Sequence, residues 1–129
     1  MSVHFQPAGY NTAAPYLIVD GAGQTIEFLV KVFRGVERSR LMHADGRVRH
    51  AVVEIGDSVV MLADSIEGWP PVAAHVHVYV PDVDATYATA MAAGATSAQV
   101  PTKGNDADKR GGVKDPGGTT WWIATRTEG

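Results

Sequence analysis

Cysteine is absent from this chain of 129 residues. Its absence excludes a disulfide framework, a zinc site built on thiolates and a cysteine nucleophile. A chain of this length buries roughly two thirds of the surface that it exposes when unfolded, so it needs no covalent staple. The lack of cysteine also agrees with a reducing compartment, and we predict a cytoplasmic protein.

An excess of positive charge is missing as well. The chain has 11 lysines and arginines against 14 aspartates and glutamates, and its formal net charge is −3. Recognition of nucleic acid requires a basic face, and the two short basic clusters, at 47–50 and 109–110, are interpreted as solvated strand edges. No apolar run approaches the roughly 20 residues of a membrane helix. We therefore expect neither nucleic acid nor a membrane as a partner.

The spacing of apolar residues switches between strand and helix periods in an order that occurs twice. Ile26, Leu29, Val30 and Phe33 form one helical stripe, and Asp20 or a neighbouring polar residue is expected to cap that helix. The expected elements are a strand at 15–19, a helix at 25–33 and strands at 36–42, 48–55 and 58–63, followed by a strand at 75–80, a helix at 83–93 and strands at 95–100, 111–114 and 120–125.

The two halves align on each other at a constant offset. Val19 precedes the first helix as Val80 precedes the second, 61 positions later, and the same offset places Met61 on Trp122. A strand, a helix and three strands that recur as a unit predict an α+β fold made of two tandem βαβββ modules. A plain ferredoxin-like α+β domain is the competing interpretation.

Two stretches of the second half carry a family resemblance. VYVPDVDATYATAMAAGA at 78–95 and GGVKDPGGTTWWIAT at 111–125, with its D-P-x-G turn, resemble the vicinal-oxygen-chelate superfamily of glyoxalases, bleomycin-resistance proteins and dioxygenases. PYLIVDGAGQTIEFLVKVF and EIGDSVVMLAD in the first half resemble its bleomycin-resistance-like branch. The likeness extends from about residue 12 to 126. It is specific for the fold and much less specific for the activity, because this fold hosts many activities.

The resemblance implies a single domain over residues 1–129, with modules at 12–66 and 74–126 that together form a cupped mixed sheet. It also implies a homodimer, often with ligand clefts at the subunit boundary. In the metal enzymes of the superfamily, four inward-facing positions carry histidine, glutamine or glutamate ligands to a divalent metal.

Those four positions correspond here to Ala14, Met61, His75 and Trp122. Only His75 suits a hard or borderline divalent ion, because alanine and tryptophan offer no lone pair and a thioether prefers soft copper(I). A catalytic zinc typically has three protein ligands. We therefore predict no metal and no other cofactor, with a site rebuilt from His75 and His77 as the alternative.

The same positions favour an aromatic cleft. Alternation along the strands places Tyr16 with Ala14, and His75 with His77 and Tyr79, on one face. Flat rings, an adaptable thioether and a few polar tips suit a planar organic molecule. Trp121 is assigned to the core because the repeat pairs it with Val60. Trp69, in a mid-chain loop, is expected to be a lid, a dimer contact or a surface anchor. The predicted ligand-binding residues are Tyr16, Met61, Trp69, His75, His77, Tyr79 and Trp122.

Three functions are compatible with these observations. The first is a binding protein that sequesters a hydrophobic aromatic compound, such as an antibiotic, without metal or turnover. The second is an enzyme of the same superfamily, a lyase, isomerase or dioxygenase, that uses a metal or acid–base chemistry on His75 or His77. The third is a protein with a vestigial cleft that acts through its surface. We favour the first and assign no catalytic residue.

Overall fold

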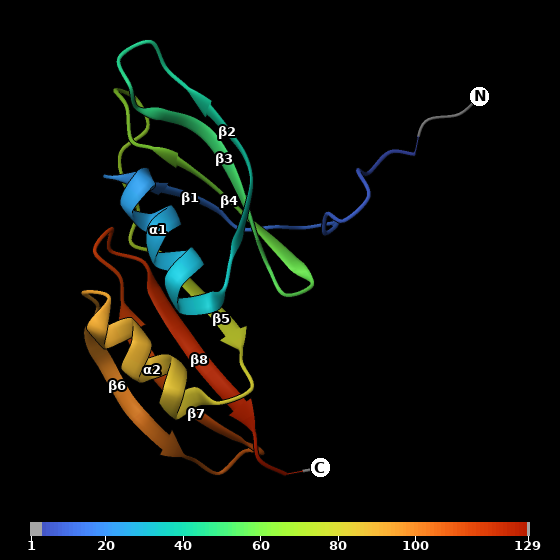
Figure 1. Ribbon diagram of the computed structural model, residues 1–129, viewed down its shortest axis with the longest axis vertical. Coiled ribbons are helices and arrows are strands. Elements are labelled where there is room, and N and C mark those ends of the chain that lie inside the picture. Colours follow the sequence, from blue (N-terminus) through green and yellow to red (C-terminus); the bar gives the residue numbers. More distant parts are fainter. Residues whose placement is uncertain (1–3, 129) are drawn as a thin grey trace.

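The computed structural model describes residues 4–128, which form two four-stranded sheets and two helices (Figure 1). The strand order is β1-β4-β3-β2 in the first sheet and β5-β8-β7-β6 in the second. The elements are β1 (Tyr16–Val19), α1 (Ala22–Phe33), β2 (Val36–Met42), β3 (Val48–Ile55), β4 (Ser58–Asp64), β5 (His75–Tyr79), α2 (Val83–Ala92), β6 (Thr96–Lys103), β7 (Asp108–Lys114) and β8 (Thr120–Arg126).

The two sheets have the same connectivity, and their parallel pairs have the same register. In each, the strand before the helix pairs in parallel with the last strand of its unit, and the remaining pairs are antiparallel. Tyr16 lies opposite Met61 in the first sheet, and His77 lies opposite Trp122 in the second. His77 lies 61 positions after Tyr16, and Trp122 lies 61 positions after Met61. The expected βαβββ repeat is therefore confirmed.

The strands of the second sheet are longer than expected. β6 continues to Lys103 instead of residue 100, and β7 begins at Asp108 instead of residue 111. Apart from Pro101, the added residues are polar, and they were missed because the prediction relied on apolar alternation. Backbone hydrogen bonds extend a β-ladder whatever the side chains are. Here Lys103 pairs with Lys109, and Asp108 pairs with Arg126.

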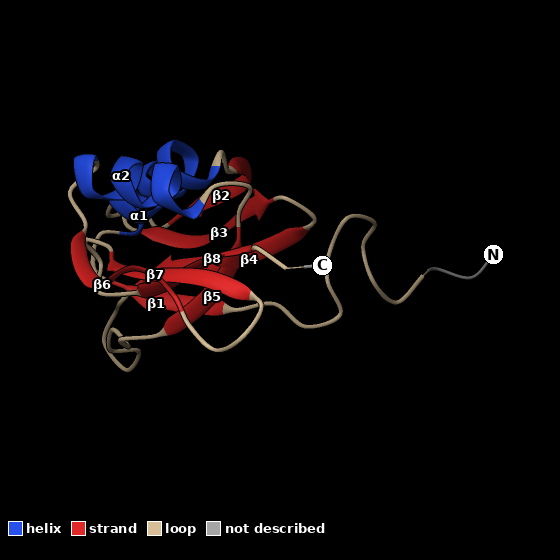
Figure 2. Ribbon diagram, turned by 90° about the horizontal axis from the view of Figure 1, so that it is seen from below, coloured by secondary structure: helices blue, strands red, loops and turns tan. Residues whose placement is uncertain are grey.

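Both helices lie on the same side of the two sheets (Figure 2). Ile26 and Leu29 on α1 are buried in one core with Trp121 and Ile123 on β8. Trp121 is 0% exposed, and its ring lies 5.3 Å from that of Phe33, so its assignment to the core is confirmed. Within the described residues, no helix has the length and apolar character needed to cross a membrane.

The cap of α1 differs from the prediction. Gly21 occupies the N-cap in a left-handed conformation, with φ at 80°, and supplies no side chain. The Asp64 carboxylate at the end of β4 instead accepts the N–H groups of Gly21 at 3.0 Å and Ala22 at 2.7 Å. Asp20, proposed as the cap, turns away and accepts a hydrogen bond from Ser65. A cap supplied from 42 residues away in the sequence has no local signature.

Asp64 also fixes β3, because its second oxygen accepts the N–H of Val48 at 2.7 Å. Replacing Asp64 with alanine leaves three backbone donors without this partner, and we expect the free energy of unfolding to fall by about 2–3 kcal/mol. Urea denaturation measures the loss. Asp57→Ala, in the β3–β4 turn, is the matched control and should change stability by less than about 0.5 kcal/mol. Equal effects of the two variants would contradict this role of Asp64.

Candidate ligand-binding face

The face of the two sheets opposite the helices carries the side chains of interest (Figure 2). On β1, Leu17 and Val19 are buried in the core, so alternation directs Tyr16 to the opposite side. On β5, Val76 and Val78 pack against the core. His75, His77 and Tyr79 therefore point to the helix-free face, where they are exposed.

The predicted site residues fall into two groups on this face. Tyr16 and Met61 are cross-strand partners in the first sheet. His77 and Trp122 are cross-strand partners in the second sheet. Trp69 comes from the connecting segment and lines the same pocket as Tyr16. The second group comprises His75, His77, Tyr79 and Trp122.

His75 and Trp122 form a coplanar pair. The indole Nε1–H of Trp122 donates to Nδ1 of His75 at 3.0 Å, and the two ring planes differ by 9°. The indole lies directly over Gly112, where a Cβ atom would approach the ring to 2.6 Å. Glycine at this position thus allows the tryptophan to lie flat on β7.

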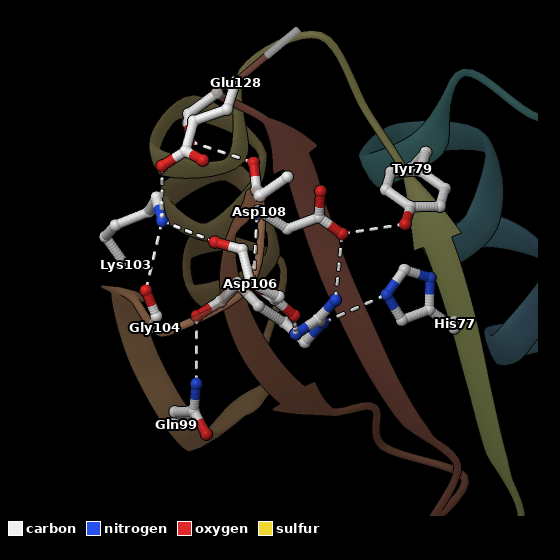
Figure 3. Close-up of polar contacts among 11 residues, drawn as sticks. His77, Tyr79, Gln99, Lys103, Gly104, Asp106, Asp108 and Glu128 are labelled. Atoms are coloured by element: carbon white, nitrogen blue, oxygen red, sulfur yellow. Dashed lines mark hydrogen bonds and ion pairs between the residues drawn. The ribbon is translucent and has the colours of Figure 1, made fainter.

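A second polar cluster surrounds Arg110 on β7 (Figure 3). Its Nε–H donates to Nε2 of His77 at 3.1 Å, and its two terminal nitrogens donate to Asp106 and Asp108, each at 3.0 Å. The Tyr79 hydroxyl donates to the same Asp108 oxygen at 2.7 Å. Arg110 is therefore held on three sides, which corrects its interpretation as a merely solvated residue.

Lys109, the neighbour of Arg110, points to the opposite side of β7. Its ammonium group contacts Asp84 on α2 at 2.8 Å. The two residues of this basic cluster therefore have different partners, because alternation along a strand directs neighbours to opposite faces.

Burial and the neighbouring Arg110 disfavour protonation of His77. Burial and the nearby Arg110 guanidinium lower the pKa of His77 below its ordinary value. Because the Nε–H of an arginine can only donate, Nε2 of His77 must be the acceptor, and the proton of the neutral ring lies on Nδ1. By the same reasoning, the neutral His75 ring carries its proton on Nε2, since Nδ1 accepts from Trp122.

The residues on this face do not fit a divalent metal. Of the four positions that the family resemblance points to, Ala14 and Trp122 offer no ligand atom, and Met61 offers only a thioether. In His75 and His77, one nitrogen of each ring already accepts a protein N–H. Across residues 4–128, no group of three or more histidine or acidic side chains is placed to hold an ion.

A pocket of about 560 Å³ lies on the helix-free side of the first sheet. Trp69, whose side chain is 63% exposed, forms one wall. The turn that carries it is held by paired backbone hydrogen bonds between Ile66 and Trp69. The pocket is lined by Tyr16, Ile18, His43, Arg49, Ala63, Asp64, Ile66 and Trp69.

Arg49 reaches this pocket because of a β-bulge. Leu41 pairs with His50 and Met42 pairs with Val48, so Arg49 is an extra residue on β3. A bulge redirects a side chain. Here Val48 enters the core, while Arg49 lines the pocket on the opposite side. Strict alternation from Ala51 places Arg49 on the helix side, so the sequence pattern missed it, and only the cross-strand register reveals its direction.

Comparisons with known proteins agree with this architecture. A family model described as the Glyoxalase/Bleomycin resistance protein/Dioxygenase superfamily matches residues 4–123. An uncharacterized protein of Mycobacterium bovis is 34% identical over 136 residues, which cover 95% of this chain and 86% of that protein.

Among solved structures, TioX from Micromonospora sp. ML1 matches with a TM-score of 0.71 and 24% identity, over 89% of this chain and 95% of that chain. TnmS3, an antibiotic binding protein from Streptomyces sp. CB03234, matches with a TM-score of 0.69 and 17% identity, over 97% and 99%. At these identities the two structures show a shared fold.

The environment of His77 predicts a measurable titration. The midpoint of its imidazole resonances should lie below 6.5, and Arg110→Met should raise this pKa by removing the nearby positive charge. In the unmodified protein, the pKa of His77 is lower in the folded state than in the unfolded chain, so the unfolded chain binds the proton more tightly. His77 therefore lowers the stability of the folded protein as the pH falls below about 6.5. NMR titration of the histidines measures the midpoint.

Lys109→Met is the matched control for Arg110→Met, since Lys109 pairs with Asp84 on α2. It should leave the pKa of His77 in place. A midpoint at or above 6.5 in the unmodified protein, or no rise of the midpoint in Arg110→Met, would contradict this account of the surroundings of His77.

Proposed function

The chain belongs to the glyoxalase/bleomycin resistance protein/dioxygenase superfamily, and from this premise we propose that it binds a hydrophobic, aromatic small molecule without metal and without turnover. The observation that carries the proposal is the pocket on the first sheet. Its walls include the rings of Tyr16 and Trp69 and the aliphatic side chain of Ile18. Concave, mostly apolar pockets of this size with few polar groups are typical small-molecule sites.

The second sheet supports the proposal through its hydrogen-bond donors. The lone-pair nitrogens of His75 and His77 are occupied, so each neutral ring presents an N–H group: Nε2–H on His75 and Nδ1–H on His77. Trp122 adds a flat ring whose indole N–H already donates to His75. Such a surface favours a planar ligand that carries hydrogen-bond acceptors, such as the carbonyl groups of many polycyclic antibiotics.

We further propose that the protein works as a homodimer in the cytoplasm. Residues 4–15, before β1, extend away from both sheets (Figures 1 and 2), and Phe5 among them is 87% exposed. Val72, next to β1, and Tyr79 are also exposed apolar or aromatic side chains. Apolar groups left uncovered in this way favour contact with a second protein surface. A second copy of the chain would also enclose ligand between the open faces.

An antibiotic is the ligand class that we favour. The fold neighbour TnmS3 is an antibiotic binding protein. The aromatic pocket of the present chain is compatible with such compounds, although the low identity to TnmS3 transfers only the fold. Sequestration requires that the compound is released chemically unchanged, and this distinguishes it from the lyase, isomerase or dioxygenase alternative.

Titration with a panel of planar anthraquinone, anthracycline and flavonoid compounds tests the proposal through quenching of tryptophan fluorescence. We expect saturable binding that does not change when nickel, zinc or manganese is added. Trp69→Ala should weaken binding about tenfold because an aromatic wall of the pocket is lost, whereas Trp69→Phe should keep most of it. Met91→Ala, on the exposed side of α2, is the matched control and should bind normally.

Product analysis of the same mixtures separates binding from catalysis. Recovery of the unaltered compound supports sequestration. Binding that appears only with a metal, or consumption of the compound, would contradict the proposed function and favour an enzyme.

A further inference from the structure

We propose that the pocket on the first sheet recognises an aromatic ligand that carries a single carboxylate, and that Arg49 is the residue that selects it. This inference rests on the proposed small-molecule binding and adds the chemical class of the ligand. It follows from three features of the pocket. Arg49 is a cation without a partner, the walls around it are largely apolar, and the carboxylate of Asp64 already accepts backbone N–H groups.

Arg49 differs from most basic residues of the chain. Within residues 4–128 it makes no ion pair and no side-chain hydrogen bond, although it lines the pocket. Arg110 on the other sheet is saturated by two carboxylates and His77. Arg110 is therefore a rigid structural cation, whereas Arg49 keeps its donors free. The basic residues with an ion-pair partner are Arg38, Arg40, Arg47, Lys103, Lys109 and Arg110.

The surroundings of Arg49 strengthen its attraction for an anion. The bulge on β3 brings Arg49, an exposed residue, to the pocket that Tyr16, Ile18 and Trp69 also line. A bound aromatic ring excludes water from this pocket, and a charge interacts more strongly in a less polar medium. The planar fork of arginine matches a carboxylate with two parallel N–H bonds.

Asp64 limits the ligand to one negative charge. Its carboxylate also lines the pocket, but its two oxygens accept three backbone N–H groups from Gly21, Ala22 and Val48. Asp64 makes no ion pair with Arg49, and its own negative charge disfavours a second negative charge on the ligand. It also occupies the first N–H groups of α1 that a phosphate would use. Arg49 is the only lysine or arginine among the lining residues, and His43 is the remaining group able to gain a positive charge. A doubly charged phosphate has too few cations here, while a carboxylate matches the single arginine.

A matched pair of probes tests this assignment. Anthraquinone-2-carboxylate and anthraquinone-2-carboxamide share the ring system and differ in charge. Tryptophan quenching at pH 7.5 gives the ratio of their affinities for the unmodified protein, for Arg49→Met and for Arg49→Lys. We expect the unmodified protein to favour the carboxylate about tenfold, as for one charged hydrogen-bonded pair. Arg49→Met should lose the preference, and Arg49→Lys should retain part of it because the charge remains without the fork.

Arg38→Met is the control for overall charge. Arg38 lies on the same sheet, pairs with Glu54 and does not line the pocket, so its removal changes the net charge equally. It should leave the preference for the carboxylate intact.

The outcomes separate the two proposals. If both probes bind equally well, or if Arg49→Met retains the preference, the inference about Arg49 is wrong while small-molecule binding stands. If neither probe binds to the unmodified protein, both proposals are overturned. A preference that is lost in Arg49→Met and kept in Arg38→Met supports the inference.

Discussion

The carboxylate of Asp64 connects three elements that are distant in the sequence. From the end of β4 it accepts the N–H groups that begin α1 and the N–H group that begins β3. The first contact holds the helix on one side of the sheet. The second fixes Val48 with its side chain in the core, next to the bulge that directs Arg49 into the pocket. The equivalent position of the second half, 61 residues later, is Thr125, whose hydroxyl donates to the Val80 carbonyl. The two halves therefore share a topology but differ in how the helix is anchored.

The two open sheet faces have complementary chemistry. The first is apolar and carries one cation without a partner, whereas the second carries a hydrogen-bonded network of His77, Arg110, Asp106 and Asp108, in which one buried oxygen of Asp108 has no partner. Arg110 forms ion pairs with both Asp106 and Asp108, and these pairs hold the network in place within the protein itself. It can present imidazole N–H groups in fixed directions. The pocket on the first sheet suits a molecule with an aromatic body and a single negative charge, as proposed above.

The topology could be predicted from the sequence because it depends on the spacing of apolar residues along the chain and on an internal repeat. Alternation also identified the side of the sheet on which Tyr16, His77 and Trp122 lie, and it separated Trp121 from its neighbour. Two kinds of feature were not predictable. The cap of α1 comes from Asp64, a distant residue with no local motif. The direction of Arg49 depends on a register shift against β2, and strand alternation alone gives the opposite answer.

The central claim is that His75 and His77 act as fixed hydrogen-bond donors toward an organic ligand and not as metal ligands. Long-range ¹H–¹⁵N correlation spectra of the imidazoles at pH 7.5, recorded with and without equimolar nickel or zinc, test it directly. The structure predicts a protonated Nε2 on His75 and a protonated Nδ1 on His77, because Trp122 and Arg110 occupy the other nitrogens. Neither tautomer should change when metal is added. The opposite tautomers, or shifts of both rings on addition of one equivalent of metal, would contradict the claim.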